Sequence, residues 1–279
     1  MSRSEHFYPE IDWYGDSRAE NVVGWLPAFG DSGTMTARPY IEQLNQQGWS
    51  VMVTNHHRSG YRMSDTRDEV LRHLLQASRE RVLLAGASFG AQAMAEVLRS
   101  VTPNSHAAQL HGRFSAISIC GVSGGQDTLK PIGWSKQIHG PVSGGIFKLG
   151  QAIQIMTGSD SPFDEDDPKV GASIKPHQRF RKWHFTGRAL LEQMYAMATT
   201  PPVFDGEFAG IPALILTTEG DDHLLKAQAA NNLLRAFSNG RLEYVDLSIH
   251  CDLTELPSQY GPFIWDFADR IISSPVSSR

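Results

Sequence analysis

The sequence has only two cysteines, Cys120 and Cys251, among its 279 residues. Two cysteines cannot build a disulfide framework, and their spacing is not that of a metal site, so two free thiols are expected. The N-terminal segment has no apolar stretch of signal-peptide length, and no later run approaches membrane-spanning length. These absences favour a cytoplasmic location and argue against a membrane partner.

An excess of basic residues is also missing. Lys and Arg total 25 against 30 Asp and Glu, which gives a formal net charge of −5. A protein that binds the phosphate backbone of nucleic acid needs a basic stripe, and the sequence has none. Nucleic acid is therefore not an expected partner. Apolar residues make up 41% of the chain, and the expected organisation is one domain with an insertion.

What the sequence does contain is a regular alternation of short apolar runs with segments of helical period. Strands are predicted over residues 21–26, 50–54, 81–85, 114–119, 213–218 and 241–247. Helices are predicted over residues 39–47, 67–78, 91–100 and 227–237, with a last helix that carries Phe263, Phe267 and Ile271. This alternation predicts an α/β fold, a doubly wound and mostly parallel sheet with helices on both faces.

The alternation breaks between residues 126 and 204, where Gly and Pro are frequent. We interpret residues 126–204 as an inserted, mainly helical cap. Residues 1–125 and 205–279 then form the core.

Two charged stretches lie within the predicted cap. Residues 164–167 are acidic, and residues 175–185 are basic and aromatic. Either the two stretches neutralise each other at the surface, or Arg179, Arg181 or Lys182 meets an anionic substrate.

The segment Gly86-Ala87-Ser88-Phe89-Gly90 lies directly between a predicted strand and a predicted helix. A G-x-S-x-G pattern alone is a weak signal. Between a strand and a helix, however, it predicts a tight turn whose flanking residues must be small and whose strain exposes the serine hydroxyl. Ser88 is therefore the predicted nucleophile. The alternative is a Gly-rich turn between a strand and a helix in which the serine has no catalytic role.

A serine hydroxyl is a poor nucleophile unless a base takes its proton and an acid orients that base. In folds with this turn, the acid and then the histidine follow the serine in chain order, on loops after late strands. His250 follows the last predicted strand and is the predicted base. Other histidines fit less well because they precede Ser88, lie in the cap or lie beside the acid: His56, His57, His73, His177, His184 and His223.

Acyl transfer to a serine also needs an oxyanion hole, two backbone N–H groups aimed at the charge that develops on the attacked oxygen. Phe89, the residue after the nucleophile, is the predicted first donor. The second donor is expected from the loop after the first long strand, residues 26–33.

Two longer segments carry a specific resemblance. They read Trp25-Leu-Pro-Ala-Phe-Gly-Asp-Ser-Gly33 and Gly48-Trp-Ser-Val-Met-Val-Thr-Asn-His-His-Arg-Ser-Gly60. Together with the turn at Ser88, they resemble the strand, oxyanion loop, helix, strand and Arg-x-Gly turn of the α/β-hydrolase superfamily, in its esterase-like serine branch. The resemblance implies the α/β-hydrolase fold and Phe29 as the second oxyanion donor. The chain departs from the usual pattern in having Pro27-Ala28 in place of His-Gly.

The same resemblance places the triad acid after residues 213–218, where the loop reads Glu219-Gly-Asp-Asp-His-Leu-Leu225. Two aspartates compete there. Counting back from the apolar pair that ends this loop favours Asp222, because the superfamily has Asp-x-Leu-Val segments at this point. Counting forward from the strand favours Asp221. Asp222 is the preferred acid, and the other aspartate is expected to cap the next helix.

These residues predict hydrolysis of a carboxylic ester-type bond through an acyl-enzyme on Ser88, with no metal or organic cofactor. The apolar side chains of the cap favour a small hydrophobic substrate. The same triad serves thioester hydrolysis, carbon–carbon hydrolysis and aminopeptidase activity. An acyltransferase and a non-catalytic ligand-binding protein are further alternatives, because fold does not fix function.

Overall fold

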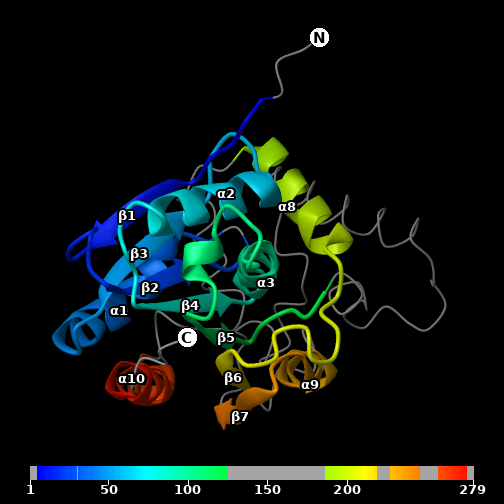
Figure 1. The fold of residues 1–279 in the computed structure, drawn as a ribbon. Helices are drawn as coiled ribbons and strands as arrows, with labels where there is room; N and C mark the ends of the chain where they lie inside the picture. Colours follow the sequence, from blue (N-terminus) through cyan, green and yellow to red (C-terminus); the bar gives the residue numbers. More distant parts are fainter. Residues whose placement is uncertain (1–4, 30, 125–185, 219–226, 246–256, 275–279) are drawn as a thin grey trace.

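A computed structural model describes residues 5–29, 31–124, 186–218, 227–245 and 257–274. Seven strands form one sheet in the order β1-β3-β2-β4-β5-β6-β7 (Figure 1). The strands are β1 (Glu10–Tyr14), β2 (Asn21–Leu26), β3 (Ser50–Asn55), β4 (Arg81–Ala87), β5 (Phe114–Ile119), β6 (Pro212–Thr218) and β7 (Asn239–Val245). Strand β1 pairs antiparallel with β3, and every other pairing is parallel. The predicted mostly parallel sheet is confirmed.

Helices cover both faces of the sheet, as predicted. Helices α1 (Gly33–Gln46) and α10 (Pro257–Ser273) pack on one face, and α2 (Met63–Leu74), α3 (Gly90–Ser100) and α9 (Ala227–Ala236) pack on the other. The chain moves in opposite directions along the sheet from β2 to β3 and from β4 to β5. Because crossovers between parallel strands keep one hand, these opposite directions place α1 and α3 on opposite faces.

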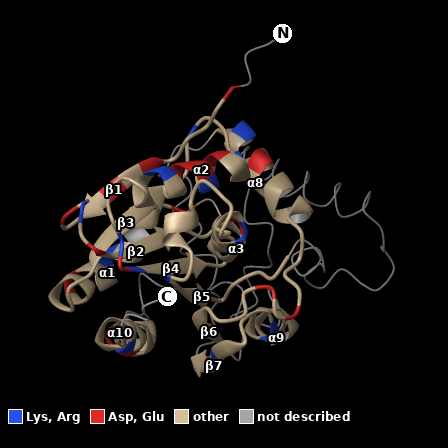
Figure 2. Ribbon diagram, viewed as in Figure 1, with Lys and Arg blue, Asp and Glu red and all other residues tan. Residues whose placement is uncertain are grey.

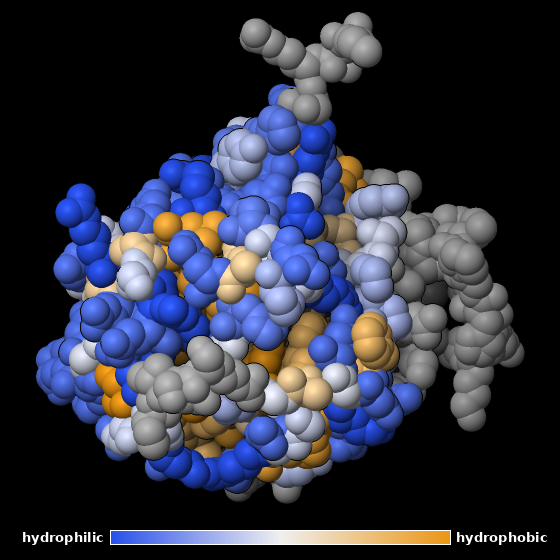
Figure 3. Space-filling model, in the orientation of Figure 1, coloured by the Kyte–Doolittle hydropathy of each residue, from blue (hydrophilic) through white to orange (hydrophobic). Residues whose placement is uncertain are grey.

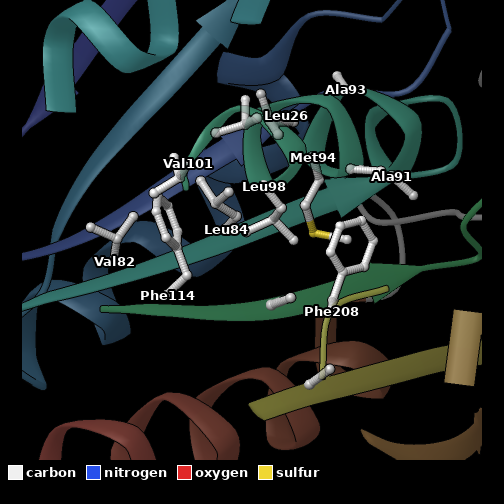
Figure 4. Packing of buried hydrophobic residues seen from close by; sticks show 14 of the residues in the cluster. Leu26, Val82, Leu84, Ala91, Ala93, Met94, Leu98, Val101, Phe114 and Phe208 are labelled. Atoms are coloured by element: carbon white, nitrogen blue, oxygen red, sulfur yellow. The ribbon is translucent and has the colours of Figure 1, made fainter. Parts of the chain in front are cut away.

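The core beside α3 shows why these residues form these elements. Strand β4 is buried over six of its seven residues, so its sequence is apolar on both sides of the chain, as is typical of a central parallel strand. On one face, Leu84 packs with Met94 and Leu98 of α3 and with Phe114 and Phe208 (Figure 4). Met94 and Leu98 are four residues apart and therefore lie on the same side of their helix.

Two helices begin earlier than the sequence predicted. Helix α1 begins at Gly33 rather than at residue 39, and Pro39 lies inside it. A Cβ at Gly33 would clash with the carbonyl oxygen of Thr54, so glycine allows the start of α1 to approach β3 closely. Helix α2 begins at Met63 rather than at residue 67. Its first turn carries Asp65, which accepts a hydrogen bond from the backbone N–H of Phe7 at 2.6 Å.

Strand β1, which the sequence analysis did not predict, lies at one edge of the described sheet, opposite β7. The last predicted strand also differs, because β7 begins two residues before residue 241. Charges of both signs are interspersed over the described elements (Figure 2). The face in Figure 3 is mostly hydrophilic, with small separate apolar areas. Among the described residues, no helix is both long and apolar enough to span a membrane.

The strand order has a switch point between β2 and β4, where successive connections leave in opposite directions along the sheet. Strands β3 and β4 lie on opposite sides of β2, and Leu26, the last residue of β2, pairs with Gly86 of β4. In open α/β sheets, ligands bind outside the carboxyl ends of the strands at such a switch point. The loops after β2 and β4 therefore flank the place where a site is expected.

Candidate active site

The turn between β4 and α3 holds Ser88 in a strained backbone conformation. Ser88 has a φ of 47°, a region that non-glycine residues rarely adopt and that costs free energy of order 1–3 kcal/mol. Strand β4 ends at Ala87 and helix α3 begins at Gly90, so Ser88 lies between them. The strand, turn and helix predicted around the G-x-S-x-G pattern are therefore present, and the Ser88 side chain is half-buried.

Both glycines of the pattern are required by packing. A Cβ at Gly86 would lie 2.7 Å from the carbonyl oxygen of Gly90 and 2.8 Å from Ala91 N. A Cβ at Gly90 would clash with the carbonyl oxygen of Leu26 and would lie 2.7 Å from that of Pro27. The prediction that small residues must flank Ser88 is confirmed. The second contact also shows that the turn after β4 lies against the loop after β2.

Backbone hydrogen bonds hold Ser88 in place. Its N–H donates to the carbonyl of Ile119 at 2.8 Å, at the end of β5. Its carbonyl accepts from Ala91 N at 3.1 Å and from Val122 N at 3.2 Å. The strained residue is thus anchored to the neighbouring strand as well as to its own helix, which lets the strain persist.

Phe89, the first predicted oxyanion donor, is the N-cap of α3. N–H groups at a helix start lack intrahelical acceptors, and the helix dipole makes this end positive. The Phe89 ring is fully buried, with ring centroids 5.5 Å from Tyr61 and 6.1 Å from His56. Because the ring is packed, the Phe89 backbone is held in place at the start of α3, the end of the helix that favours an anion.

Phe29, the second predicted donor, lies in the loop after β2. The N–H of Asp31 donates to the carbonyl of Ala28 at 3.2 Å, which closes a turn around Phe29. The Phe29 side chain is half-buried. The structure therefore places Phe29 on the loop whose first residues contact Gly90, beside the turn that carries Ser88 and Phe89.

His56 is a neighbour of this site that the sequence analysis set aside because it precedes Ser88. Only 4% of its surface is exposed, and its Nε2 lies 3.4 Å from the carbonyl oxygen of Ala28. Burial lowers the pKa of His56 to about 4, and the hydrogen bond to Ala28 opposes part of that shift. His56 is therefore neutral near pH 7, and since a carbonyl can only accept, Nε2 carries the proton.

The predicted triad partners Asp222 and His250, and the competing Asp221, lie outside the described residues. The strands that precede them are described. Strand β6 ends at Thr218 and β7 at Val245, and both run parallel to β4. Because parallel strands end at one edge of a sheet, the chain leaves β6 and β7 at the same edge as Ser88.

Part of the predicted cap is described as helix α8 (Gly187–Thr199), whereas residues 126–185, with the basic and aromatic stretch, are outside the described ranges. The start of α8 is tied to the loop after β3, because Thr186 N donates to the Arg58 carbonyl at 2.9 Å and Tyr61 N to Glu192 Oε2 at 2.6 Å. Its C-terminal part accepts a 3.3 Å hydrogen bond from Gln92 Nε2, at the Met197 carbonyl. Helix α8 therefore lies beside the start of α3.

Among the side chains that the structure describes, no three of His, Cys, Asp or Glu are grouped so that they could hold a metal ion.

No protein-family model matches the sequence, and no curated protein matches it at a significant level. Similar solved structures do exist. MenH from S. aureus superposes with a TM-score of 0.68 at 12% identity, over 94% of this chain and 99% of that one. The esterase EaEST from Exiguobacterium antarcticum gives 0.66 at 12% identity, over 94% and 98%. A carboxylesterase of Nitrososphaera gargenis gives 0.64 at 15% identity, over 97% of both chains.

Two of these neighbours are esterases by name, and all three cover nearly the whole chain. At 12–15% identity, the likeness concerns the fold. It agrees with the sheet order and with the turn at Ser88. The chain therefore has the α/β-hydrolase fold, as the resemblance in its sequence implied.

Proposed function

We propose that the chain is a serine hydrolase that cleaves carboxylic esters, with Ser88 as nucleophile, His250 as base and Asp222 as the acid that orients the base. The observation that carries the proposal is the positive φ of Ser88, between two glycines that tolerate no side chain, at the switch point between β2 and β4. Strained non-glycine residues cluster at active sites, where the surrounding structure holds them.

In the proposed reaction, Ser88 Oγ attacks the ester carbonyl carbon while His250 takes the hydroxyl proton. The tetrahedral oxyanion accepts hydrogen bonds from the N–H groups of Phe29 and Phe89. Collapse of this intermediate expels the alcohol, which takes the proton from His250. Water, deprotonated by His250, then attacks the acyl-enzyme, and the acid leaves as Ser88 regains its proton. The reaction uses side chains and backbone groups alone.

Chain order and sheet order support this assignment. Asp222 and His250 follow β6 and β7, which end at the same edge of the sheet as β4. We also propose a small hydrophobic acyl group, because the segment predicted as a cap carries many large apolar side chains, including Trp134, Phe147, Met156 and Phe163.

Hydrolysis of a p-nitrophenyl ester series, from acetate to long acyl chains, tests the proposal. Ser88→Ala should lower kcat/KM by about 10⁴-fold or more, because loss of the nucleophile leaves only oxyanion and binding contributions. Ser118→Ala is the matched control. Ser118 is fully buried on the adjacent strand β5, where it pairs with Gly86 of β4. No described residue forms a hydrogen bond with its hydroxyl.

A fluorophosphonate probe separates the alternatives. Labelling of the wild type that is absent in Ser88→Ala and in His250→Ala supports serine catalysis. If the folded wild type is labelled but hydrolyses no ester of the series, the substrate is a thioester, a diketone or an amide. A folded wild type that is neither labelled nor active contradicts the proposal and favours a ligand-binding role.

The acid can be assigned by comparing two variants that differ by one position. Asp222→Asn should lower kcat by about 10⁴-fold, since it leaves the histidine in the wrong tautomer. Asp221→Asn should change kcat by less than about tenfold, because asparagine caps a helix about as well as aspartate does. The reverse order of effects would assign the role to Asp221.

A further inference from the structure

The last residue of β3, Asn55, fastens the far end of the loop after β2. Its Oδ1 accepts hydrogen bonds from Ser32 Oγ at 3.0 Å and from Thr34 N at 3.1 Å. Its Nδ2 donates to Asp12 Oδ2 at 2.9 Å and to Thr34 Oγ1 at 3.0 Å. The start of α1 is thus fixed to the sheet, and this fixes one end of the turn that carries Phe29.

His56, the next residue, contacts the other end of the same turn. Its Nε2–H points to the carbonyl oxygen of Ala28, which also accepts the N–H of Asp31 that closes the turn. The His56 ring packs edge-on against Tyr61, with ring centroids 5.2 Å apart, and lies 6.1 Å from the ring of Phe89. One side chain therefore touches the supports of both predicted oxyanion donors.

The chemistry of the His56 ring is unusual for a residue of the core. Its Nδ1 is buried, and no described residue hydrogen-bonds to it. A buried nitrogen without a partner costs about 1–3 kcal/mol, which an aromatic hydrocarbon of similar size would avoid. Among the described residues, the hydrogen bond that the ring makes is the one to Ala28. This bond is what distinguishes histidine from phenylalanine at position 56.

We propose that His56 is a positioning residue, which holds the turn from Ala28 to Asp31 so that the Phe29 N–H faces the developing oxyanion. The proposal rests on the proposed hydrolytic function. His56 touches no reacting atom and transfers no proton, and its Nε2–H stays on the ring throughout the reaction. The bond of 3.4 Å is long, as hydrogen bonds around a catalytic site often are before substrate binds.

Loss of the His56 bond should weaken one oxyanion donor rather than remove it. Removal of a whole donor lowers kcat by about 10²–10³-fold. His56→Phe keeps the ring and its packing but loses the N–H, and it should lower kcat by about 10- to 100-fold. KM should change by less than about threefold, because the oxyanion forms after substrate binding.

Two further variants separate positioning from packing. His56→Gln retains an N–H donor close to the place of Nε2, and its kcat should lie at least about fivefold above that of His56→Phe. His73→Phe is the matched control. His73 is a partly buried histidine of α2 that accepts a hydrogen bond from Trp13 Nε1 of β1 at 3.3 Å, and the kcat of His73→Phe should stay near that of the wild type.

Amide hydrogen exchange of the segment 26–34 gives a readout that does not depend on turnover. His56→Phe should accelerate exchange in this segment and leave strands β4 and β5 unchanged, and His56→Gln should restore slow exchange. If the wild type hydrolyses esters and His56→Phe keeps both its kcat and its slow exchange, the positioning role is overturned while the proposed function stands.

The opposite failure gives a different pattern. If the wild type hydrolyses no ester, the proposed function fails and the exchange data alone judge His56. Acceleration confined to residues 26–34 then supports His56 as the group that holds this turn. If exchange in His56→Phe is unchanged, or is accelerated equally throughout the protein, the positioning role of His56 is overturned.

Discussion

At the ends of two neighbouring parallel strands, the chain places a non-glycine residue at positive φ, 47° at Ser88 after β4 and 46° at Cys120 after β5. Both residues are anchored to the next strand along the sheet. Ser88 N donates to Ile119 at 2.8 Å, and Cys120 N donates to Leu216 at 2.7 Å. The backbone conformation and its support are thus nearly the same in the two turns.

The two side chains differ in where they lie. Ser88 is half-buried and precedes a helix that starts at the switch point of the sheet. Cys120 is 1% exposed, and its Sγ lies 3.7 Å from the hydroxyl of Tyr260 on α10. Strain alone therefore does not mark a reactive residue. The turn after β4 stands out because strain, partial exposure and the switch point of the sheet coincide there.

The largest expected difference between the turns is in turnover. Ser88→Ala should lower ester hydrolysis by about 10⁴-fold, whereas Cys120→Ala should leave kcat within about twofold and cost about 1 kcal/mol of stability from a small cavity. Steady-state kinetics and urea unfolding measure the two effects. Loss of turnover in a stable Cys120→Ala protein would erase the distinction between the turns.

The glycines beside the two turns should also respond differently. Gly90→Ala meets backbone oxygens of Leu26 and Pro27, and should cost about 3 kcal/mol or more and displace the loop that carries Phe29. Gly121→Ala meets chiefly side chains, the Ser118 hydroxyl first, and should cost about 1–2 kcal/mol with little change in kcat. Equal losses of stability and activity in the two variants would show that the turn after β4 is no more tightly constrained than the turn after β5.

Lowering the pH should destabilise the folded protein around the turn after β4, through protonation of His56. Its pKa of about 4 in the folded protein lies below the ordinary value of 6.5. The unfolded chain therefore binds the proton more tightly, so the stabilisation is complete above pH 6.5 and is lost as the pH falls toward 4. Between pH 7 and pH 5, the free energy of unfolding should fall by about 2 kcal/mol through His56 alone. Chemical unfolding of His56→Gln at both pH values should lack this part of the decrease.

The smallest expected effect is relief of strain. Glycine adopts positive φ without the penalty of about 1–2 kcal/mol that other residues carry, although it gains more entropy on unfolding. Ser88→Gly and Cys120→Gly should therefore each be more stable than the corresponding alanine variant, by about 1 kcal/mol at Ser88 and less at the buried Cys120. Thermal unfolding of the two glycine and two alanine variants measures these differences in stability. If Ser88→Gly were less stable than Ser88→Ala, backbone strain would not be a measurable cost at Ser88.

The central strands were predictable because they are buried on both sides. The apolar runs of β2, β4 and β5 end at residues that begin turns, so their positions and the strand, turn and helix around Ser88 follow from the sequence. The position of strand β1 did not follow from the sequence, because an edge strand is half-exposed and its alternation of apolar and polar residues is weak. Pro39 misled the prediction of α1, since proline usually lies in the first turn of a helix and here lies inside it.

The contacts around the candidate site were less predictable. The sequence contains Asn55 and His56, but their approach to the loop after β2 depends on β3 lying beside β2 in the sheet. Chain order alone placed His56 among the histidines that precede the nucleophile. The assignments of Asp222 and His250 remain predictions, since both follow from chain order and neither lies among the described residues.

The contact between Gly90 and the carbonyls of Leu26 and Pro27 also bears on how this protein could be redesigned. The turn that carries Ser88 and the loop beside it share one tight boundary, so neither can be exchanged with a segment from another protein independently of the other. A library that varies residues 27–29 should therefore vary residues 89–91 together with them. Grafting of the site onto another scaffold should likewise transfer both segments as one unit.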